Sequence, residues 1–171
     1  MKTFQKYLLF VVLGLLAVAG YYFIQNLIPF DRQRPTIGES APEFSLVDLG
    51  GGRVRLSDFR GKVVLLNFGA SWCPPCKEEM PGFQNVFLKY RNKGFAVITV
   101  ALDDSNPSSM VKELGIRFPV VMPDEKISGD YGNIVHIPVS FLIGKDGKII
   151  KKVLGLYAEK DLRSDVELAL K

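Results

Sequence analysis

The chain has 171 residues, a formal charge of +4 and only two cysteines, Cys73 and Cys76. About 140 residues follow an apolar N-terminal stretch, which is enough for one domain with its own core. Nothing in the charge suggests a nucleic-acid-binding surface. Two neighbouring cysteines also cannot form the disulfide framework of a small secreted domain. The composition therefore predicts one folded domain behind an apolar segment.

The N-terminal segment predicts export of the domain. Residues 7–24 carry no charge and follow Lys2 and Lys6. This run is close to the roughly 20 residues that a helix needs to cross a bilayer. Positive charge before the run, and aromatic residues at 21–23 near its end, favour an uncleaved signal anchor with a cytoplasmic N-terminus. The alternative is a signal peptide cleaved after Ala19, and both readings place the domain outside the cytoplasm.

The chain divides by composition into three parts. Residues 1–28 form the anchor or signal peptide, residues 29–42 a proline-punctuated linker, and residues 43–171 the domain. The domain begins with two short runs, 44–47 and 53–56, on either side of three consecutive glycines. Glycines allow positive φ, so we expect a β-hairpin here.

Two continuous apolar runs, residues 62–68 and 95–101, predict strands that are buried on both faces. Between them, residues 74–90 carry apolar side chains at helical spacing, with Pro81 inside the predicted helix. Because a helix follows directly after residue 73, the cysteine motif lies at the carboxyl end of the first buried strand.

The remaining chain continues to alternate between helices and strands. Its predicted elements are a helix over 108–114 capped near Asn106, strands over 118–122 and 139–143, a turn at 145–148 into a strand over 149–154, and a final helix over 158–170. Strands that alternate with helices and then close with a hairpin indicate an α/β fold with a mixed central sheet.

The two cysteines suggest a redox pair. If a strand ends before Trp72 and a helix begins at Pro74, Cys73 occupies the N-cap region. Free amides and the helix dipole lower the pKa of a thiol there, which favours Cys73 as the attacking thiolate. Cys76 lies one turn further along the helix, more shielded, and is expected to resolve the mixed disulfide.

Two prolines between the cysteines indicate the direction of the reaction. Neither Pro74 nor Pro75 has an N–H to donate to the Cys73 sulfur, although both fit the first helical turn. Fewer donors stabilise the thiolate less. Since a strong oxidant needs a well-stabilised reduced form, the loss of donors favours a reductant.

Residues 67–81 read Asn-Phe-Gly-Ala-Ser-Trp-Cys-Pro-Pro-Cys-Lys-Glu-Glu-Met-Pro. This segment resembles the active site of the thioredoxin superfamily, specifically its membrane-anchored TlpA/ResA type. Residues 41–49 resemble the opening strand of that type, and Ile137-Pro138 with the strand after it resembles the cis-proline loop. The resemblance covers about residues 38–170.

The resemblance implies a thioredoxin fold with an N-terminal β-hairpin extension and a helix-bearing central insertion. It also implies a cis Pro138 beside Cys73, with the Ile137 backbone free to pair with a bound substrate. Where many relatives have threonine after the cis-proline, this chain has Val139.

Two further positions bear on proton transfer. Asn67 stands where cytoplasmic thioredoxin has an aspartate, so that buried proton acceptor is missing. Glu79 matches an acidic residue of the ResA-like proteins. One helical turn after Cys76, it is placed to assist proton movement, and its charge disfavours the thiolate.

These observations give a predicted site. The catalytic residues are Cys73, Cys76 and Glu79. The residues expected to contact substrate are Trp72, Pro74, Pro75, Ile137 and Pro138. No cofactor is expected apart from the redox-active disulfide itself.

The predicted function is that of a membrane-tethered, extracytoplasmic reductase of disulfides in exported proteins. By resemblance, apocytochrome c is a leading substrate class. Reducing equivalents must come from a membrane thiol protein, because the compartment is oxidising. Two alternatives stay open: a disulfide-forming oxidase with the same cysteines, and a copper metallochaperone of the same fold, since thiolates suit Cu(I).

Other readings are disfavoured. A zinc site needs more ligands than two cysteines and the single histidine, His136. In a peroxiredoxin, Pro and Thr or Ser stand where this chain has Leu66 and Ala70. His136 is expected to be a loop residue without a role at the site, Lys77 to lie in solvent, and the Asp103-Asp104 pair to act as turn or capping residues. Trp72 fits either core packing or a docking surface.

Overall fold

The computed structural model describes residues 12–23, 35–102 and 107–171. The chain divides into two units, Met1–Arg32 and Gln33–Lys171. In the first, residues 12–23 are helical and their side chains are almost all exposed. Over the three described ranges, no helix has both the length and the apolar character needed to cross a membrane. The ends of the predicted 7–24 span lie outside the described residues.

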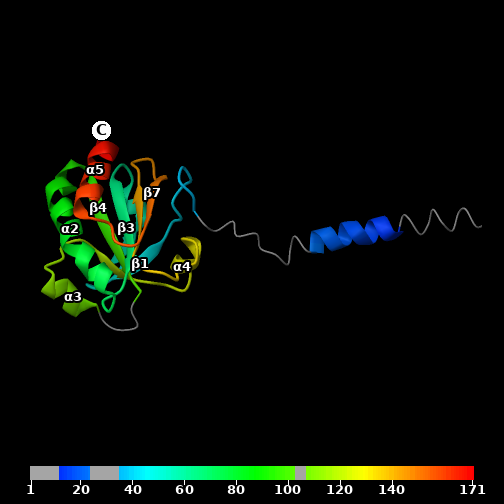
Figure 1. The fold of residues 1–171 in the computed structure, drawn as a ribbon, viewed down its shortest axis with the longest axis horizontal. Helices are drawn as coiled ribbons and strands as arrows, with labels where there is room; N and C mark the ends of the chain where they lie inside the picture. The colour runs from blue at the N-terminus through cyan, green and yellow to red at the C-terminus, as the bar shows by residue number, and fades with distance from the viewer. Residues whose placement is uncertain (1–11, 24–34, 103–106) are drawn as a thin grey trace, which may run out of the picture. The chain divides into compact units, whose positions relative to one another are not determined.

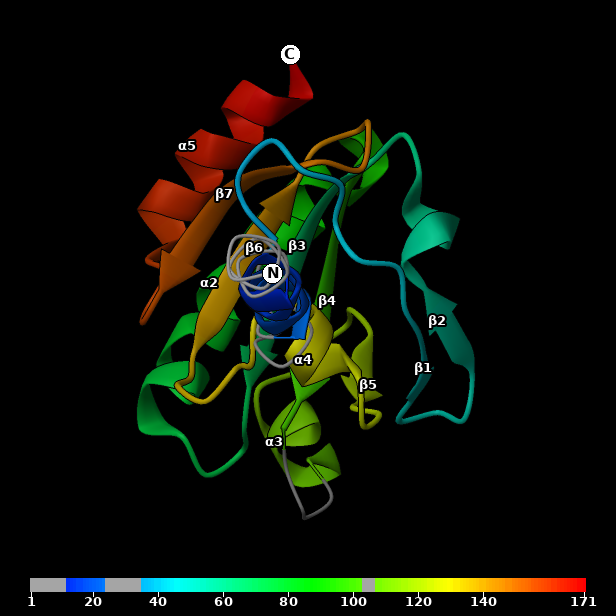
Figure 2. The same cartoon turned by 90° about the vertical axis from the view of Figure 1, so that its right-hand side faces the viewer.

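The second unit is built on one seven-stranded sheet with the order β2-β1-β5-β4-β3-β6-β7 (Figure 1). Its strands are β1 (Ser45–Asp48), β2 (Arg53–Arg55), β3 (Val63–Gly69), β4 (Phe95–Ala101), β5 (Val120–Met122), β6 (Val139–Ile143) and β7 (Ile149–Leu154). The central strand β3 is parallel to β4 and antiparallel to β6. Figure 2 shows the strands in this order, with β7 and β2 at opposite edges. The predicted α/β fold with a mixed sheet is confirmed.

Helices cover both faces of the sheet. The helical elements are η1 (Leu56–Phe59), α2 (Pro74–Tyr90), η2 (Arg91–Lys93), α3 (Ser108–Glu113), α4 (Ile127–Asp130) and α5 (Glu159–Leu170). Helices α2 and α5 lie on one face, while α4 and the chain before β1 lie on the other (Figure 1). The elements therefore form three layers with the sheet in the middle.

The two faces bury separate apolar clusters, as a strand apolar on both sides requires. All seven residues of β3 and all seven of β4 are buried. On the α2 and α5 face, Leu65, Phe83 and Leu162 belong to one cluster. On the opposite face, Phe68 and Tyr131 belong to the other, with ring centroids 5.4 Å apart.

Most predicted elements are confirmed, and three details differ. Strand β5 starts at Val120 rather than at residue 118, with Pro119 before it unable to donate a ladder hydrogen bond. The N-cap of α3 is Pro107, which has no side-chain acceptor, and Asn106 lies outside the described residues. Helix α4 matches no predicted range, because its four residues are too few to show helical periodicity.

The chain before β1 runs along the β6–β7 hairpin. The Gly38 N–H donates to the Ile149 carbonyl at 2.8 Å, and the Ala41 N–H donates to the Gly147 carbonyl at 2.9 Å. These bonds fasten the last part of the 29–42 segment to the second unit. This segment lies on the same side of the sheet as α4 (Figure 1).

Gly82 sets how closely α2 approaches α5. A Cβ at residue 82 would lie 2.9 Å from the Glu159 Cβ and 3.4 Å from its Cα. Because real Cβ atoms do not approach so closely, we expect Gly82→Ala to push the helices apart and lower the free energy of unfolding by about 1–3 kcal/mol. The measurement is urea denaturation.

Gly129 provides the matched control. It is also a helical glycine, but a Cβ there would meet only the Asn133 Oδ1, at 3.7 Å. Gly129→Ala is therefore expected to leave stability unchanged or to raise it by up to about 1 kcal/mol, the usual gain of alanine over glycine in a helix. If Gly82→Ala were as stable as the parent, the close helix approach would not exist.

Candidate functional site

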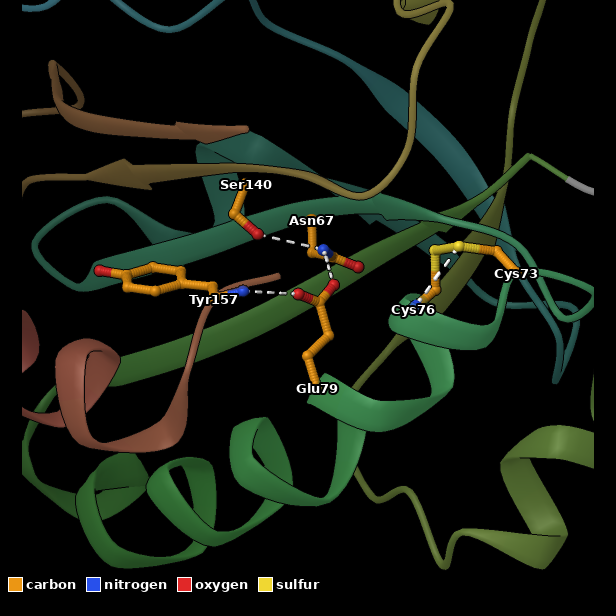
Figure 3. Close-up of a disulfide and its surroundings, with 6 residues drawn as sticks. All are labelled: Asn67, Cys73, Cys76, Glu79, Ser140 and Tyr157. Carbon is orange, nitrogen blue, oxygen red and sulfur yellow. Dashed lines mark hydrogen bonds between the residues drawn. A yellow bond between two sulfur atoms is a disulfide. The ribbon is translucent and has the colours of Figure 1, made fainter. Parts of the chain in front are cut away.

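The cysteine pair lies where the central strand passes into a helix. β3 ends at Gly69 and α2 begins at Pro74, so Cys73 is the N-cap residue with an extended backbone. Cys73 and Cys76 form a disulfide, with their Cα atoms 5.3 Å apart (Figure 3). The predicted placement of the motif at the carboxyl end of a buried strand is confirmed. The positive end of the helix dipole therefore faces the Cys73 sulfur.

The two cysteines differ in exposure and in their neighbours. Cys73 is 4% exposed and Cys76 is fully buried at 0%. The Cys76 backbone N–H donates to the Cys73 Sγ at 3.3 Å. Pro74 and Pro75 have no N–H to offer, so this amide is the first along α2 that can reach the sulfur. The side of the disulfide open to solvent is thus the Cys73 side.

The loop before β6 packs against the disulfide. The Ile137-Pro138 peptide bond is cis, as the resemblance implied. The Ile137 side chain packs on a small buried cluster of Ala70, Cys73 and Cys76. The Pro138 carbonyl accepts a 2.8 Å hydrogen bond from the Gly155 N–H, which ties the loop to the end of β7. This packing places the partly buried residue 137 directly beside the disulfide.

A buried carboxylate lies beneath the disulfide. Glu79 is 3% exposed and accepts two hydrogen bonds, one on each oxygen. The Asn67 Nδ2 donates to its Oε1 at 2.8 Å, and the Tyr157 backbone N–H donates to its Oε2 at 3.0 Å. The Asn67 Nδ2 also donates to the Ser140 Oγ at 3.1 Å. Figure 3 shows this network next to the cysteines, on the inner side of α2.

The environment of Glu79 tunes its protonation. Burial raises the pKa of Glu79 to about 7, against the opposing effect of its hydrogen bonds from Tyr157 and Asn67. The carboxyl can therefore gain or lose a proton near neutral pH, one helical turn from Cys76. The site still contains a buried acid, although residue 67 of β3 is an asparagine. Glu79 of α2 supplies that carboxyl in the space below the cysteines.

Most of the remaining predicted residues are exposed, Pro75 is half-buried, and two residues lie outside the described ranges. Trp72 is 67% exposed, so it belongs to the surface beside the disulfide and not to the core. Pro74 is also exposed, Lys77 lies in solvent as expected, and His136 is an exposed residue of the loop before Pro138. The Asp103-Asp104 pair lies outside the described residues.

Sequence reasoning missed two members of the Glu79 network. Ser140 is the single polar residue of the buried strand β6 and pairs directly with Asn67 in the β3–β6 register. Its polarity within an apolar run was a signal of a buried hydrogen bond. Tyr157 contributes only its backbone amide, for which a sequence carries no signal. Across the described part of the chain, no three His, Cys, Asp or Glu side chains gather as they would around a metal ion.

Comparisons with known proteins place this geometry among disulfide-handling proteins. Residues 37–152 match the AhpC/TSA family. The chain is 37% identical over 155 residues to "Thiol-disulfide oxidoreductase ResA" of Bacillus thuringiensis, covering 89% of this chain and 88% of that protein. It is 33% identical over 169 residues to the protein of the same name from Bacillus subtilis, covering 96% and 94%. A similar solved structure is a putative thiol:disulfide interchange protein DsbE from Chlorobium tepidum. Its TM-score is 0.73 and its identity 31%, over 80% of this chain and 99% of that one.

Proposed function

Since the chain belongs to the AhpC/TSA family and is a thiol-disulfide oxidoreductase of the ResA type, we propose that it reduces disulfides in exported proteins. The observation that carries the proposal is the Cys73–Cys76 disulfide at the start of α2, with the buried Glu79 one turn below it. This arrangement supplies a nucleophile, a resolving thiol and a proton acceptor.

The reaction starts from the dithiol form of the protein. The Cys73 thiolate attacks a sulfur of the client disulfide, and the other client sulfur leaves as a thiolate. Cys76 then gives its proton to Glu79 and attacks the Cys73 sulfur. The Cys73–Cys76 disulfide forms, the bond between Cys73 and the client breaks, and the second client sulfur leaves with the electron pair. Two enzyme thiols are oxidised, and one client disulfide is reduced to two thiols.

The roles of the two cysteines follow from their positions. Cys73 is at the N-cap and on the side open to solvent, so a client sulfur can reach it. Cys76 is completely buried, so a client cannot reach it until Cys73 has reacted. Trp72 and the Ile137 backbone flank the Cys73 side and are proposed to contact the client.

Two features support reduction as the direction. Pro74 and Pro75 withhold two amide donors from the Cys73 sulfur. An ionised Glu79 adds negative charge below the pair, and that charge disfavours a thiolate. Each effect destabilises the thiolate in the reduced form of the protein. The reduced protein therefore passes its electrons to a client disulfide more readily.

The site of action is proposed from the N-terminal sequence. The uncharged run 7–24 after Lys2 and Lys6 fits a signal anchor, which would hold the domain on the extracytoplasmic side of the membrane. A membrane thiol protein would return electrons to the disulfide. Apocytochrome c fits as a client, since its paired haem-attaching cysteines must be reduced before haem is bound.

The reduction potential decides between reductant and oxidase. We expect a potential below about −220 mV, at or under the glutathione couple, because the prolines and Glu79 both destabilise the thiolate form. Equilibration of the purified protein with glutathione redox buffers, followed by alkylation of free thiols, measures it. A potential near that of strong oxidants, about −120 mV, would contradict the reductase and favour the oxidase.

Trapping identifies the clients. Cys76→Ser leaves Cys73 able to attack and removes the thiol that releases the client, so exported proteins should accumulate as mixed disulfides in the native host. We expect these adducts in carbonate-washed membranes and expect reductant to release them. The double variant Cys73→Ser/Cys76→Ser is the control. A fully expressed Cys76→Ser protein that captured no other protein would contradict the proposed function. Adducts found on a soluble chain that had been cut after Ala19 would contradict the uncleaved signal anchor.

A further inference from the structure

The Asn67 carboxamide has partners on one side only. Its Nδ2 donates to the Glu79 Oε1 and to the Ser140 Oγ, at 2.8 and 3.1 Å. Its Oδ1 is buried and has no hydrogen-bond partner within the described residues. Figure 3 shows that oxygen turned away from Glu79 and Ser140, toward the disulfide. A buried acceptor without a donor is costly, so its persistence calls for a physical reason.

A second buried polar atom, on the strand next to Asn67, also lacks a partner in the described part of the chain. Thr99 pairs with Asn67 in the parallel β3–β4 register, on the opposite side of β3 from Ser140. Thr99 is 1% exposed, and its Oγ1 has no hydrogen bond. Directly opposed residues of neighbouring strands place their side chains on the same face of the sheet. The Thr99 side chain therefore lies on the same face of the sheet as Asn67, across β3 from Ser140.

The buried Cys76 sulfur lies on that side as well. A Cβ at Gly69 would be 3.4 Å from the Cys76 Sγ and 3.5 Å from the Asn67 Oδ1. The two atoms thus border the same space above Gly69. Asn67 thus has its hydrogen-bond partners, Glu79 and Ser140, on its nitrogen side, whereas its oxygen faces the space that the Cys76 sulfur borders.

Protonation of Glu79 changes which orientation of the Asn67 carboxamide matches its hydrogen-bonding neighbours. An ionised Glu79 only accepts, which suits the Nδ2 that faces it now. A protonated Glu79 needs an acceptor on its O–H, and the Nδ2 would then oppose it, donor against donor. A half-turn of the carboxamide about its last side-chain bond removes this conflict. The Oδ1 then accepts from Glu79 and Ser140, and the Nδ2 donates to the Thr99 Oγ1 and toward the Cys76 sulfur.

We propose that the Asn67 carboxamide turns over when Glu79 takes up the proton of Cys76, and that Asn67 and Thr99 are positioning residues for the resolving step. The inference rests on the proposed role of Glu79 as the proton acceptor. The turned carboxamide directs an N–H toward the Cys76 thiolate at the moment the thiolate forms, and Thr99 holds it there. In the turned orientation, both the oxygen and the nitrogen of the Asn67 carboxamide have a hydrogen-bond partner.

The other ionisable groups around Glu79 leave this exchange intact. The Cys73–Cys76 disulfide lies one helical turn before Glu79 and does not titrate, and Tyr157 contacts Glu79 only through its backbone amide. The Tyr157 hydroxyl donates to Asp165 of α5, which is also paired with Lys151 of β7 at 2.6 Å. This charged pair lies at the far end of the tyrosine ring, so it does not compete for the Asn67 amide.

Nuclear magnetic resonance of the full chain in detergent micelles, with the disulfide intact, tests the turn directly. At about pH 9, where Glu79 is ionised, the Asn67 amide protons should show Overhauser contacts to Ser140. At about pH 5 these should fade, and contacts to the Thr99 methyl group should appear. The change should follow the same titration as the Glu79 carboxyl carbon. Amide contacts that stay on Ser140 throughout this titration would overturn the inference.

Thr99→Val tests the positioning role, because valine keeps the shape of threonine and removes its hydroxyl. Single-turnover reaction of the reduced protein with an aromatic disulfide releases one thiol on Cys73 attack and a second on Cys76 resolution. We expect Thr99→Val to slow the second release about five-fold, the size of one hydrogen bond, and to leave the first unchanged. Thr99→Ser should restore the parent rate, since it keeps the hydroxyl.

The roles of Asn67 and Thr99 can fail without affecting the role of Glu79 as the proton acceptor. A second release unchanged in Thr99→Val, or slowed equally in Thr99→Ser, would overturn the role of Thr99. Either result, or an immobile Asn67 amide, leaves the proposed role of Glu79 standing, because Glu79→Gln tests that role independently of the two positioning residues.

Discussion

Cys73→Ser is expected to abolish disulfide reduction, whereas Cys76→Ser is expected to keep the first attack and lose the second. Cys73 has the N-cap position and the open side of the pair, and Cys76 is fully buried. Loss of the nucleophile should lower the rate of the first step at least about a thousandfold, because no other group can form the mixed disulfide. Rapid mixing with an aromatic disulfide measures both steps.

The two single variants serve as controls for each other. Cys76→Ser should release one equivalent of aromatic thiol per chain and stay modified, and Cys73→Ser should release almost none. A Cys73→Ser protein that reacted as fast as Cys76→Ser would show that the buried thiol is accessible and that the roles are reversed. Equal loss in both variants would instead mean that neither thiol acts alone as the nucleophile.

The redox pair and the framework around it were predictable from local sequence. The continuous apolar runs that became β3 and β4 differ from their predicted ranges by one residue or less. A run buried on both faces needs no knowledge of its partners to be recognised. The helix α2 begins at Pro74 as predicted, because proline is well tolerated in the first turn. These signals are contained in each segment by itself.

The network under the disulfide was not predictable in the same way. Whether Glu79 is solvated or buried depends on which face of α2 packs on the sheet, and its neighbours Glu78 and Lys77 are exposed. Its partners come from distant parts of the chain, 12 positions away for Asn67 and 78 for Tyr157. Such contacts arise from the β3–β6 register and the return of the chain before α5. Only the folded arrangement makes the carboxylate a buried acid.

Glu79→Gln is expected to slow the resolving step about a hundredfold, the usual contribution of a positioned proton acceptor. In the parent protein the second thiol release should rise with pH through about 7, because burial holds the Glu79 pKa there and only the ionised form accepts a proton. Glutamine cannot accept it, so this inflection should disappear. The first attack, which uses Cys73, should keep its rate or become faster, since a nearby negative charge has been removed.

The same substitution also changes how stability depends on pH. The folded-state pKa of Glu79, about 7, lies above its ordinary value of 4.5 because burial disfavours the charged form. Between these values the native protein binds more protons than the unfolded chain, so the free energy of unfolding falls as pH rises. The full decline attributable to this carboxyl is about 3 kcal/mol. The decline begins above about pH 4 and is complete by about pH 8.

Glu79→Gln should therefore remove this decline, and the stability of the variant relative to the parent should increase by about 3 kcal/mol from acid to alkaline pH. The comparison of slopes is the decisive one, because glutamine also replaces a hydrogen-bond acceptor by a donor on one side, a cost that does not vary with pH. Urea denaturation at several pH values measures the slopes, and Glu78→Gln on the exposed face of α2 is the control. Parallel curves for Glu79→Gln and the parent would mean that the carboxyl titrates as it does in water and cannot serve as the proton acceptor for Cys76 near neutral pH.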